Sequence, residues 1–358
     1  MRLLFAVLAV LFAAPAVADS AVPDDVVIRG AIEGYIRPNF RIFADATEAL
    51  KADVVGLCAA PSPAALTLAQ DKFRSTVAAF SRIEFVRLGP LGLADRLERL
   101  LFWPDSKGIA LKQVQAALAA KDATAAEAGA LQKKSVAMQG LGALEYLLFG
   151  TGNEDLGSGE GAYRCSYAAA ITTLVDGLAT TIATEWQDIG PDGPAGHMLD
   201  PRPDAQDYRS RTEVLEKLAG TLINGTETIR DQRLKPVIGE GGGKPKPKSA
   251  LFWRSGMTAP ALAANFGGLR DFFVAAKYPE ALGTTNSWVA SSVMFELDNA
   301  VRAATALVDP IDKVVGDPVL FAAFKSLVTV TGSLDSLLGT NLATALGLSV
   351  GFSQLDGD

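Results

Sequence analysis

The sequence predicts an all-α protein made of two helical bundles related by a pseudo-two-fold. Hydrophobic residues make up 49% of the 358 residues, and alternating runs of β-branched and aromatic residues, which are typical of strands, are few. Leucines recur at helical spacing, as at Leu215, Leu218 and Leu222, and a second apolar segment runs from Tyr167 to Trp186. Helices joined by Pro/Gly loops should therefore dominate the fold.

The chain begins with the three parts of a secretory signal peptide. Met1 and Arg2 precede an apolar stretch from Leu3 to Ala14, and the small residues Ala16-Val17-Ala18 follow. The apolar stretch is shorter than the ~20 residues that span a bilayer, and no cysteine follows it to accept a lipid. We expect residues 1–18 to be cleaved and the mature chain to be periplasmic, without a transmembrane anchor.

The formal net charge is −7, and removal of Arg2 with the leader makes the mature chain more acidic. An acidic, evenly mixed surface argues against nucleic acid or an anionic membrane as the partner. It fits a protein whose ligand is cationic or neutral.

The two cysteines, Cys58 and Cys165, predict one structural disulfide, because an exported chain meets an oxidising compartment. The alternative is a pair of metal-binding thiolates. It lacks the close Cys/His spacing of metal sites.

Pro/Gly-rich segments divide the chain. Residues 191–204 form a linker between an N-terminal bundle, residues 19–190, and a C-terminal bundle, residues 205–358. We expect no helix to continue through this linker. A second Gly/Pro/Lys segment, residues 239–248, interrupts the C-terminal bundle.

Short landmarks repeat in the same order in both halves, which indicates an internal duplication. The matched pairs are residues 84–87 with 227–230, residues 101–103 with 251–253, and Glu145 with Glu296. A ligand site at the interface between the halves is therefore expected.

Glu145 is the only charged residue of the segment 135–150. Burying an ionised acid without a partner costs several kcal/mol or raises its pKa, so a lone acid in an apolar helix is either paired or chemically used. The structural interpretation is an acid paired with an arginine that fixes helix packing. The functional interpretation is a ligand or metal site.

The run Gly140-x-Gly142-x-x-Glu145, followed by Tyr146-Leu147-Leu148-Phe149-Gly150, resembles the signature of the imelysin-like family. That family's motif reads Gly-x-His-x-x-Glu, so glycine stands here at the histidine position. Further landmarks of the resemblance cover most of the mature chain, at residues 57–62, 84–90, 102–105, 164–167 and 252–255.

The resemblance implies a fold of two helical bundles and a periplasmic or surface protein linked to iron uptake. Some members were first described as peptidases. Gly142 counts against a metallopeptidase here, because glycine supplies no side-chain ligand where the family has an imidazole.

Five residues are candidate ligand contacts: Glu145, Glu84, Arg87, Arg254 and Ser255. Most Glu/Arg pairs three residues apart on a helix, as we expect for Glu84 and Arg87, are exposed salt bridges. Arg254 and Ser255 are polar at the edge of a segment, where they could bind an anion or hold Glu145.

Glu145 and Asp176 are the candidate metal ligands, because two carboxylates suit a hard cation such as iron or another divalent ion. Asp176 is the only charged residue between Arg164 and Glu185, and its alternative is a solvent-facing position. The single histidine, His197, lies in the linker, where we expect it to be exposed. One imidazole supports no catalytic triad.

The sequence therefore predicts an exported imelysin-like protein that binds a metal ion, haem or a small ligand, with no catalytic residues assigned. Its expected partner is an iron-uptake component of the cell envelope. The alternatives are a metallopeptidase, or a scaffold that has lost the metal site and docks partners through the 239–248 segment.

Overall fold

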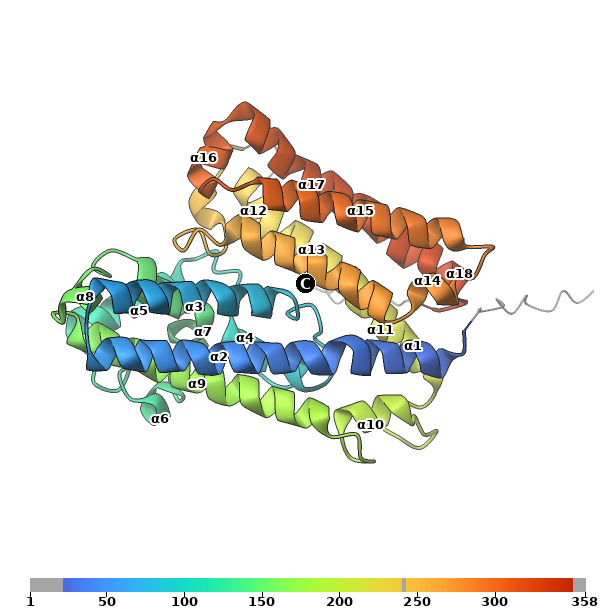
Figure 1. The fold of residues 1–358 in the computed structure, drawn as a ribbon, viewed down its shortest axis with the longest axis horizontal. Coiled ribbons are helices and arrows are strands. Elements are labelled where there is room, and N and C mark those ends of the chain that lie inside the picture. The colour runs from blue at the N-terminus through green and yellow to red at the C-terminus, as the bar shows by residue number, and fades with distance from the viewer. Residues whose placement is uncertain (1–21, 240–242, 350–358) are drawn as a thin grey trace, which may run out of the picture.

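The computed structural model describes residues 22–239 and 243–349, and within these ranges the chain is all-α with no strand. The predicted signal peptide, residues 1–18, lies outside the described residues. Figure 1 shows two layers of helices, an N-terminal layer in blue to green and a C-terminal layer in yellow to red. We call residues 22–190 the first half and residues 205–349 the second half.

The first half is built around α2, α3 and α9. Its helices in chain order are α1 (Asp24–Ala31), α2 (Arg37–Ala59), α3 (Pro63–Ser81), α4 (Arg96–Leu100), α5 (Ile109–Ala120), α6 (Ala128–Leu131), α7 (Gly140–Phe149), α8 (Asp155–Ser158) and α9 (Ala162–Gln187).

The longest helix run of the first half joins α1 to α2 through a π-helical turn, Ile32–Ile36. Along α2 the buried side chains recur every three or four residues, which gives one apolar stripe that faces α3 and α9: Phe43, Thr47, Leu50, Val54 and Leu57. After α2 the chain reverses at Ser62, whose hydroxyl accepts a hydrogen bond from the Ala65 N–H at 3.1 Å and caps α3.

The predicted disulfide is confirmed. Cys58 at the end of α2 is bonded to Cys165 near the start of α9, with 5.6 Å between the two Cα atoms. It joins the two helices at the end of the bundle where α3 and α8 also meet.

The second half is built around α13, which packs on α15 within its own half and on α3 of the first half. Its helices in chain order are α11 (Arg211–Glu227), α12 (Lys235–Ile238), α13 (Thr258–Ala275), α14 (Tyr278–Ala281), α15 (Ser287–Ala306), α16 (Ile311–Gly316), α17 (Pro318–Ser336) and α18 (Ala343–Ala345). π-Helical turns join α11 to α12, at Thr228–Leu234, and α17 to α18, at Leu337–Leu342.

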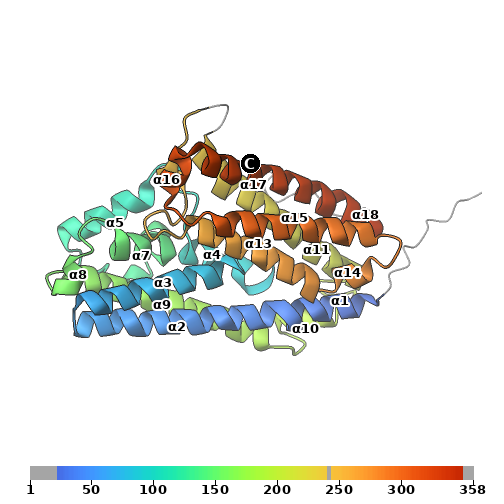
Figure 2. The same cartoon turned by 45° about the horizontal axis from the view of Figure 1, so that its top comes forward.

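The two halves meet along a continuous contact surface, which we call the seam. On it α1 packs on α11, α3 packs on α13, and the Ile32–Ile36 turn packs on α13. The rotated view in Figure 2 shows α13 between α15 and the first half. Tyr35 and Phe85 each pack edge-on against Phe272, at centroid separations of 5.4 and 5.6 Å. At Gly225 a Cβ would come within 2.9 Å of the Phe85 Cβ, so the close approach of α11 requires glycine.

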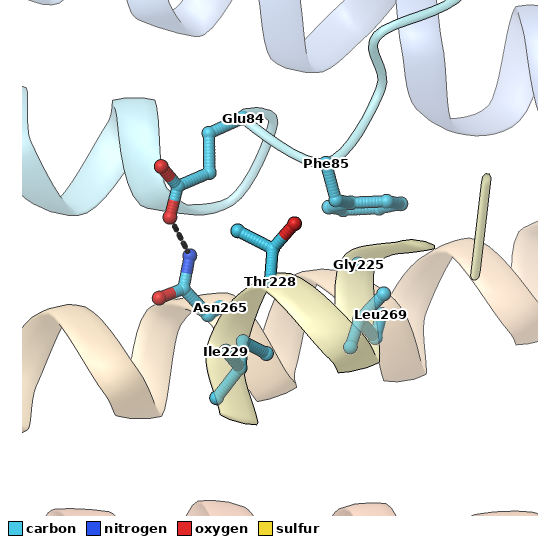
Figure 3. A pocket seen from close by; sticks show the side chains of 7 residues that line it. All are labelled: Glu84, Phe85, Gly225, Thr228, Ile229, Asn265 and Leu269. Carbon is cyan, nitrogen blue, oxygen red and sulfur yellow. Dashed lines mark hydrogen bonds between the residues drawn. The ribbon is translucent and has the colours of Figure 1, made fainter. Parts of the chain in front are cut away.

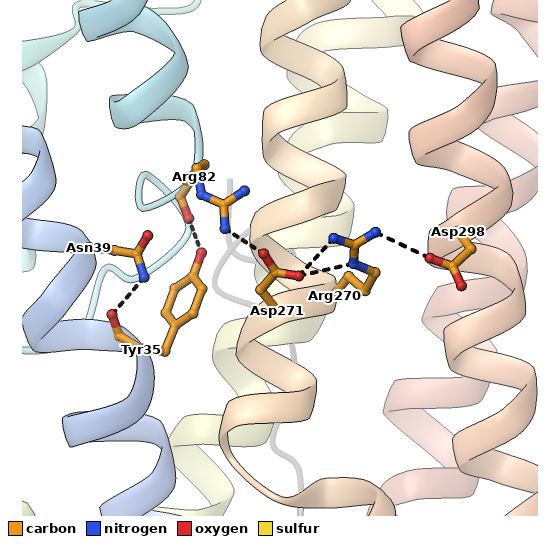
Figure 4. A network of polar contacts seen from close by, with 6 residues as sticks. All are labelled: Tyr35, Asn39, Arg82, Arg270, Asp271 and Asp298. Carbon is orange, nitrogen blue, oxygen red and sulfur yellow. Dashed lines mark hydrogen bonds and ion pairs between the residues drawn. The ribbon is translucent and has the colours of Figure 1, made fainter.

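A polar network crosses the seam beside this aromatic cluster (Figure 4). Arg82, just after α3, pairs with Asp271 of α13 at 2.6 Å, and Arg270 continues the network to Asp298 of α15. Tyr35 donates a hydrogen bond to the Arg82 carbonyl oxygen. These charges are a third or more exposed, so each ion pair contributes little to stability by itself.

The predicted linker contains a short helix that begins and ends within it, so neither α9 nor α11 continues through the linker. Residues Pro194–Leu199 form α10, and Ala195 and Met198 on it are fully buried. Proline fits the first turn of a helix, where its missing N–H is not needed, and Pro194 is the first residue of α10. The division of the chain into two domains stays a prediction.

Two helical segments, Ala162–Gln187 and Pro318–Ala345, are long and apolar enough to cross a membrane by length and composition alone. Core helices of globular proteins meet the same criteria. In the first segment α9 packs inside the bundle and carries the buried polar residues Arg164 and Asp176.

Replacing both cysteines by serine should destabilise the protein by about 4–5 kcal/mol, because the bond closes a loop of 107 residues and restricts the unfolded chain. Guanidinium unfolding of Cys58→Ser/Cys165→Ser and of wild type, each with and without reductant, measures this loss. Wild type should lose stability in reductant and the variant should not. Equal midpoints for the two oxidised proteins would contradict a stabilising role.

Candidate functional site

Glu145 lies in α7 and its side chain is buried, with 4% of the residue exposed. The helix begins at Gly140, which has a positive φ of 69° and sits so close to the carbonyl oxygens of Arg99 and Leu100 that a Cβ would come within 2.6 Å of both. Only glycine fits this position. The first glycine of the motif thus fixes where α7 starts and how deeply it inserts, and this places Glu145 at the second half.

A turn of the second half, residues 251–256, receives the Glu145 carboxylate. The Ser255 N–H and hydroxyl both donate to Glu145 Oε1, at 2.9 and 2.8 Å. Phe252 adopts a positive φ of 58° at the start of this turn, and its ring packs edge-on against Phe73 of α3. Successive backbone N–H groups in such a turn form a concave anion receptor.

Burial raises the pKa of the Glu145 carboxyl above its ordinary value of 4.5. The hydrogen bonds from Ser255 and the positive charge of Arg254 favour the ionised form and oppose this effect, but burial is the larger cause. Glu145 therefore holds a proton more strongly than an exposed glutamate does. A buried, proton-retaining acid at an interface is typical of a functional position.

The Arg254 guanidinium lies over two aromatic rings. Its central carbon lies 4.4 Å from the centroid of the Trp253 ring and 5.3 Å from that of Tyr146 on α7. Throughout residues 22–239 and 243–349, no hydrogen bond or ion pair engages this guanidinium, although the Glu145 charge acts on it. Arg254 is half-buried and held in place by stacking.

Arg74 of α3 ties the same turn to the first half. Its Nε donates to the Ser255 carbonyl oxygen at 3.1 Å, and its guanidinium lies over the Phe149 ring. Arg164 of α9 donates to carbonyl oxygens at the C-terminal end of α7, including those of Leu147 and Tyr146 at 2.8 and 2.9 Å. These two arginines hold α7 and the turn against each other.

Gly142 lies on the half-exposed face of α7, in line with Tyr146 and Phe149. A Cβ at Gly142 would meet no atom within 4 Å. The position at which the imelysin-like motif has histidine is therefore open in this protein, one helical turn from Glu145.

Glu84 and Arg87 do not form the helical pair that we expected. Helix α3 ends at Ser81, and Glu84 lies in the turn that follows. Arg87 donates only to the Glu84 carbonyl oxygen, at 3.4 Å, so the expectation of an i, i+3 side-chain pair was wrong. Burial lowers the pKa of Arg87.

The Glu84 carboxylate reaches into the second half instead. Arg233 Nη2 donates to Oε2 and Asn265 Nδ2 donates to Oε1, both at 2.7 Å, and all three side chains are nearly fully buried. The Nε and Nη1 atoms of Arg233 are buried without a hydrogen-bond partner among the described residues. Arg233 belongs to the π-helical turn Thr228–Leu234, and such turns often re-aim a side chain at a site.

A small cavity lies beside this ion pair, between the two halves (Figure 3). Its volume is about 10 Å³, which is room for about one water molecule. The lining combines three polar side chains with apolar residues: Glu84, Phe85, Gly225, Thr228, Ile229, Asn265 and Leu269. A ligand larger than water does not fit without movement of the seam.

Asp176 lies elsewhere in the first half. Its carboxylate pairs with Lys51 and accepts a 3.4 Å hydrogen bond from the Thr47 hydroxyl, both on α2. The described residues contain no group of three or more His, Cys, Asp or Glu side chains that could hold a metal ion. His197 is partly exposed and lies 3.0 Å from the Asp207 carboxylate. Metal binding by Glu145 and Asp176 stays a prediction.

Sequence reasoning missed Arg233, Asn265 and Arg74. Asn265 carried a readable signal, because it is the one polar residue in the apolar run Ala259–Gly268 of α13. Arg233 and Arg74 lie among other charged residues in the sequence. Only the folded structure distinguishes them from their exposed neighbours.

Comparison with known proteins agrees with this fold. A family model described as Imelysin, with the short name Peptidase_M75, matches residues 36–334. An imelysin-like protein from Psychrobacter arcticum 273-4 has a similar structure, with a TM-score of 0.78 at 19% identity over 94% of this chain and 99% of that one.

A second similar structure is that of a protein named as an iron-regulated protein A precursor from Parabacteroides distasonis ATCC 8503. Its TM-score is 0.72 at 15% identity, over 90% of this chain and 95% of that one. At these identities the likeness concerns the fold alone. A comparison with curated proteins gave no match.

Glu84→Gln should destabilise the protein by about 3–5 kcal/mol, because it leaves the buried Arg233 charge without its counter-charge. Denaturant unfolding measures the effect, and adding Arg233→Met should recover much of the loss. Arg82→Gln is the matched control, since it removes an exposed ion pair across the same seam and should cost about 1 kcal/mol or less. A similar small loss in both variants would contradict a buried, coupled pair.

Glu145→Gln should remove a pH dependence of stability. Because the folded-state pKa is raised, the contribution of Glu145 is fully present below its ordinary value of 4.5 and is lost as the pH rises through the folded-state pKa. The melting temperature of the glutamine variant minus that of wild type should therefore grow with rising pH, by a few degrees. Glu296→Gln, on a half-exposed residue of α15, is the control. A difference in melting temperature that stays constant as the pH rises would contradict the prediction.

Proposed function

The chain belongs to the imelysin family, and on this premise we propose that it is an exported binding protein connected with iron acquisition, with its ligand site at the seam beside Glu145. The disulfide Cys58–Cys165 fits an oxidising compartment outside the cytoplasm. The iron-regulated relative supports a link with iron through the shared fold.

One observation carries the location of the site. The buried Glu145 carboxylate of the first half meets the 251–256 turn of the second half, and the helix face next to it is open at Gly142. Every other buried carboxylate in the described part of the chain is closed in by partners: Glu84 by Arg233 and Asn265, and Asp176 by Lys51 and Thr47.

The arrangement can respond to a cation by exchanging a proton for it. Burial raises the pKa of Glu145, and a cation arriving from the Gly142 side would stabilise the ionised form. Iron is in this proposal the cargo of the protein, and the expected partner is an iron-uptake component of the cell envelope.

The family's short name suggests a metallopeptidase. No contact among the described residues favours that function. A partner-binding scaffold would use the 239–248 segment, of which residues 240–242 lie outside the described ranges. The proposed function is therefore ligand binding.

The test is calorimetric titration of metal-stripped protein with Fe(II), under anaerobic conditions, and with haem. Wild type should bind one of them, and Glu145→Gln should weaken binding at least tenfold, while Glu296→Gln should leave it unchanged. Gly142→His should strengthen Fe(II) binding, because it adds an imidazole one turn from Glu145 at a position where the side chain has room. No binding by wild type, or equal binding by Glu145→Gln, would overturn the proposal.

A further inference from the structure

We propose that the ligand of this site is an anion that carries carboxylates, bound by Arg254 and Lys248 on the open side of α7. If the cargo is iron, an anionic chelate is then one form in which it reaches the site. This inference deepens the proposed function and rests on it for the link with iron, but the anion site itself is argued from its own contacts.

The first argument is the state of Arg254. A guanidinium has five N–H donors in a planar fork that matches a carboxylate with two parallel hydrogen bonds. In Arg254 none of these donors has a hydrogen-bond partner among the described residues, whereas Arg74 and Arg164 near the same helix both donate to carbonyl oxygens. The rings of Trp253 and Tyr146 hold the guanidinium in place, so the arginine side chain loses little conformational entropy when it binds a ligand.

The second argument is the charge around Arg254. The Lys248 ammonium group lies 5.7 Å from the centroid of the Trp253 ring, and the lysine is exposed. The segment from 241 to 256 contains no Asp or Glu, although it contains four basic residues: Lys244, Lys246, Lys248 and Arg254. In a chain of net charge −7, such a segment is a strong local excess of positive charge.

The third argument is that Glu145 does not cancel this charge in full. Its Oε1 atom already accepts two hydrogen bonds, from the N–H and the hydroxyl of Ser255. Arg164 adds a further positive charge near the Tyr146 ring, 5.6 Å from its centroid. The acids that act on Arg164 are Glu154 and Asp155, beyond the end of α7.

The fourth argument is space. Position 142 is a glycine, so no side chain covers the surface of α7 beside Tyr146. A Cβ at this position would meet nothing within 4 Å. A small organic anion can therefore approach the Arg254 fork along the helix.

The experiment is titration of the full-length mature protein with metal-free citrate, with ferric citrate and with inorganic phosphate, at low and at physiological salt. Citrate should bind saturably to wild type and more weakly at higher salt. Arg254→Gln should lower its affinity at least tenfold, and Lys248→Gln should lower it a few-fold. Arg254→Lys should recover only part of the loss, because it restores the charge without the fork.

Two variants elsewhere are matched controls. Arg302→Gln removes an arginine of α15, and Lys325→Gln removes a lysine that lies over the Phe321 ring of α17, 4.9 Å from its centroid. Both should bind citrate as wild type does. Equal losses in the controls, wild-type binding by Arg254→Gln, or phosphate binding as tight as citrate binding would overturn the proposed carboxylate site.

The outcomes separate this inference from the proposed function. If metal-free citrate binds through Arg254 while ferric citrate binds no differently and Glu145→Gln has no effect, the anion site stands and the link with iron fails. If Fe(II) binds through Glu145 while citrate binding is absent, the iron function stands and the anion site fails.

Discussion

The structure depends on two buried carboxylates that cross the seam in the same direction. Glu84 and Glu145 both belong to the first half, and the second half receives both, through Arg233 and Asn265 for one and Ser255 for the other. A buried carboxylate is costly unless donors reach it in good geometry. Any relative shift of the halves would therefore break both sets of contacts at once, which makes the seam a single defined arrangement.

The two carboxylates differ in what surrounds them. Glu84 is enclosed, beside a cavity for about one water molecule, and its full-charge partner Arg233 is as buried as it is. Glu145 faces neutral donors and one stacked arginine, next to the open helix face at Gly142. The first therefore holds the halves together, and the second combines that role with access from outside. This contrast favours α7 as the location of the ligand site.

Composition and leucine spacing were sufficient for the all-α fold, and the two cysteines were sufficient for the disulfide, because both depend on local pattern and compartment. The burial of Glu145 followed from its apolar neighbours, and its contact with Ser255 was among the possibilities. The partner of Glu84 did not follow. Spacing suggested Arg87, but the end of α3 at Ser81 turns the carboxylate toward Arg233, 149 residues away, and no local pattern encodes that contact. The duplicated landmarks share order in the sequence without sharing contacts, since Arg230 pairs with Asp231 and Asp335.

The first helix of the described chain belongs to the second half by its contacts, because α1 packs on α11 while its continuation α2 lies in the core of the first half. A ribosome or a secretion channel delivers α1 long before α11. The apolar side of α1, with Val27, Ile28 and Ala31, then has nothing to cover it until the chain has passed α10. Folding of this protein should therefore end with the packing of α1 on α11. A nascent chain stopped before α11 would expose the apolar side of α1 as a binding surface for chaperones.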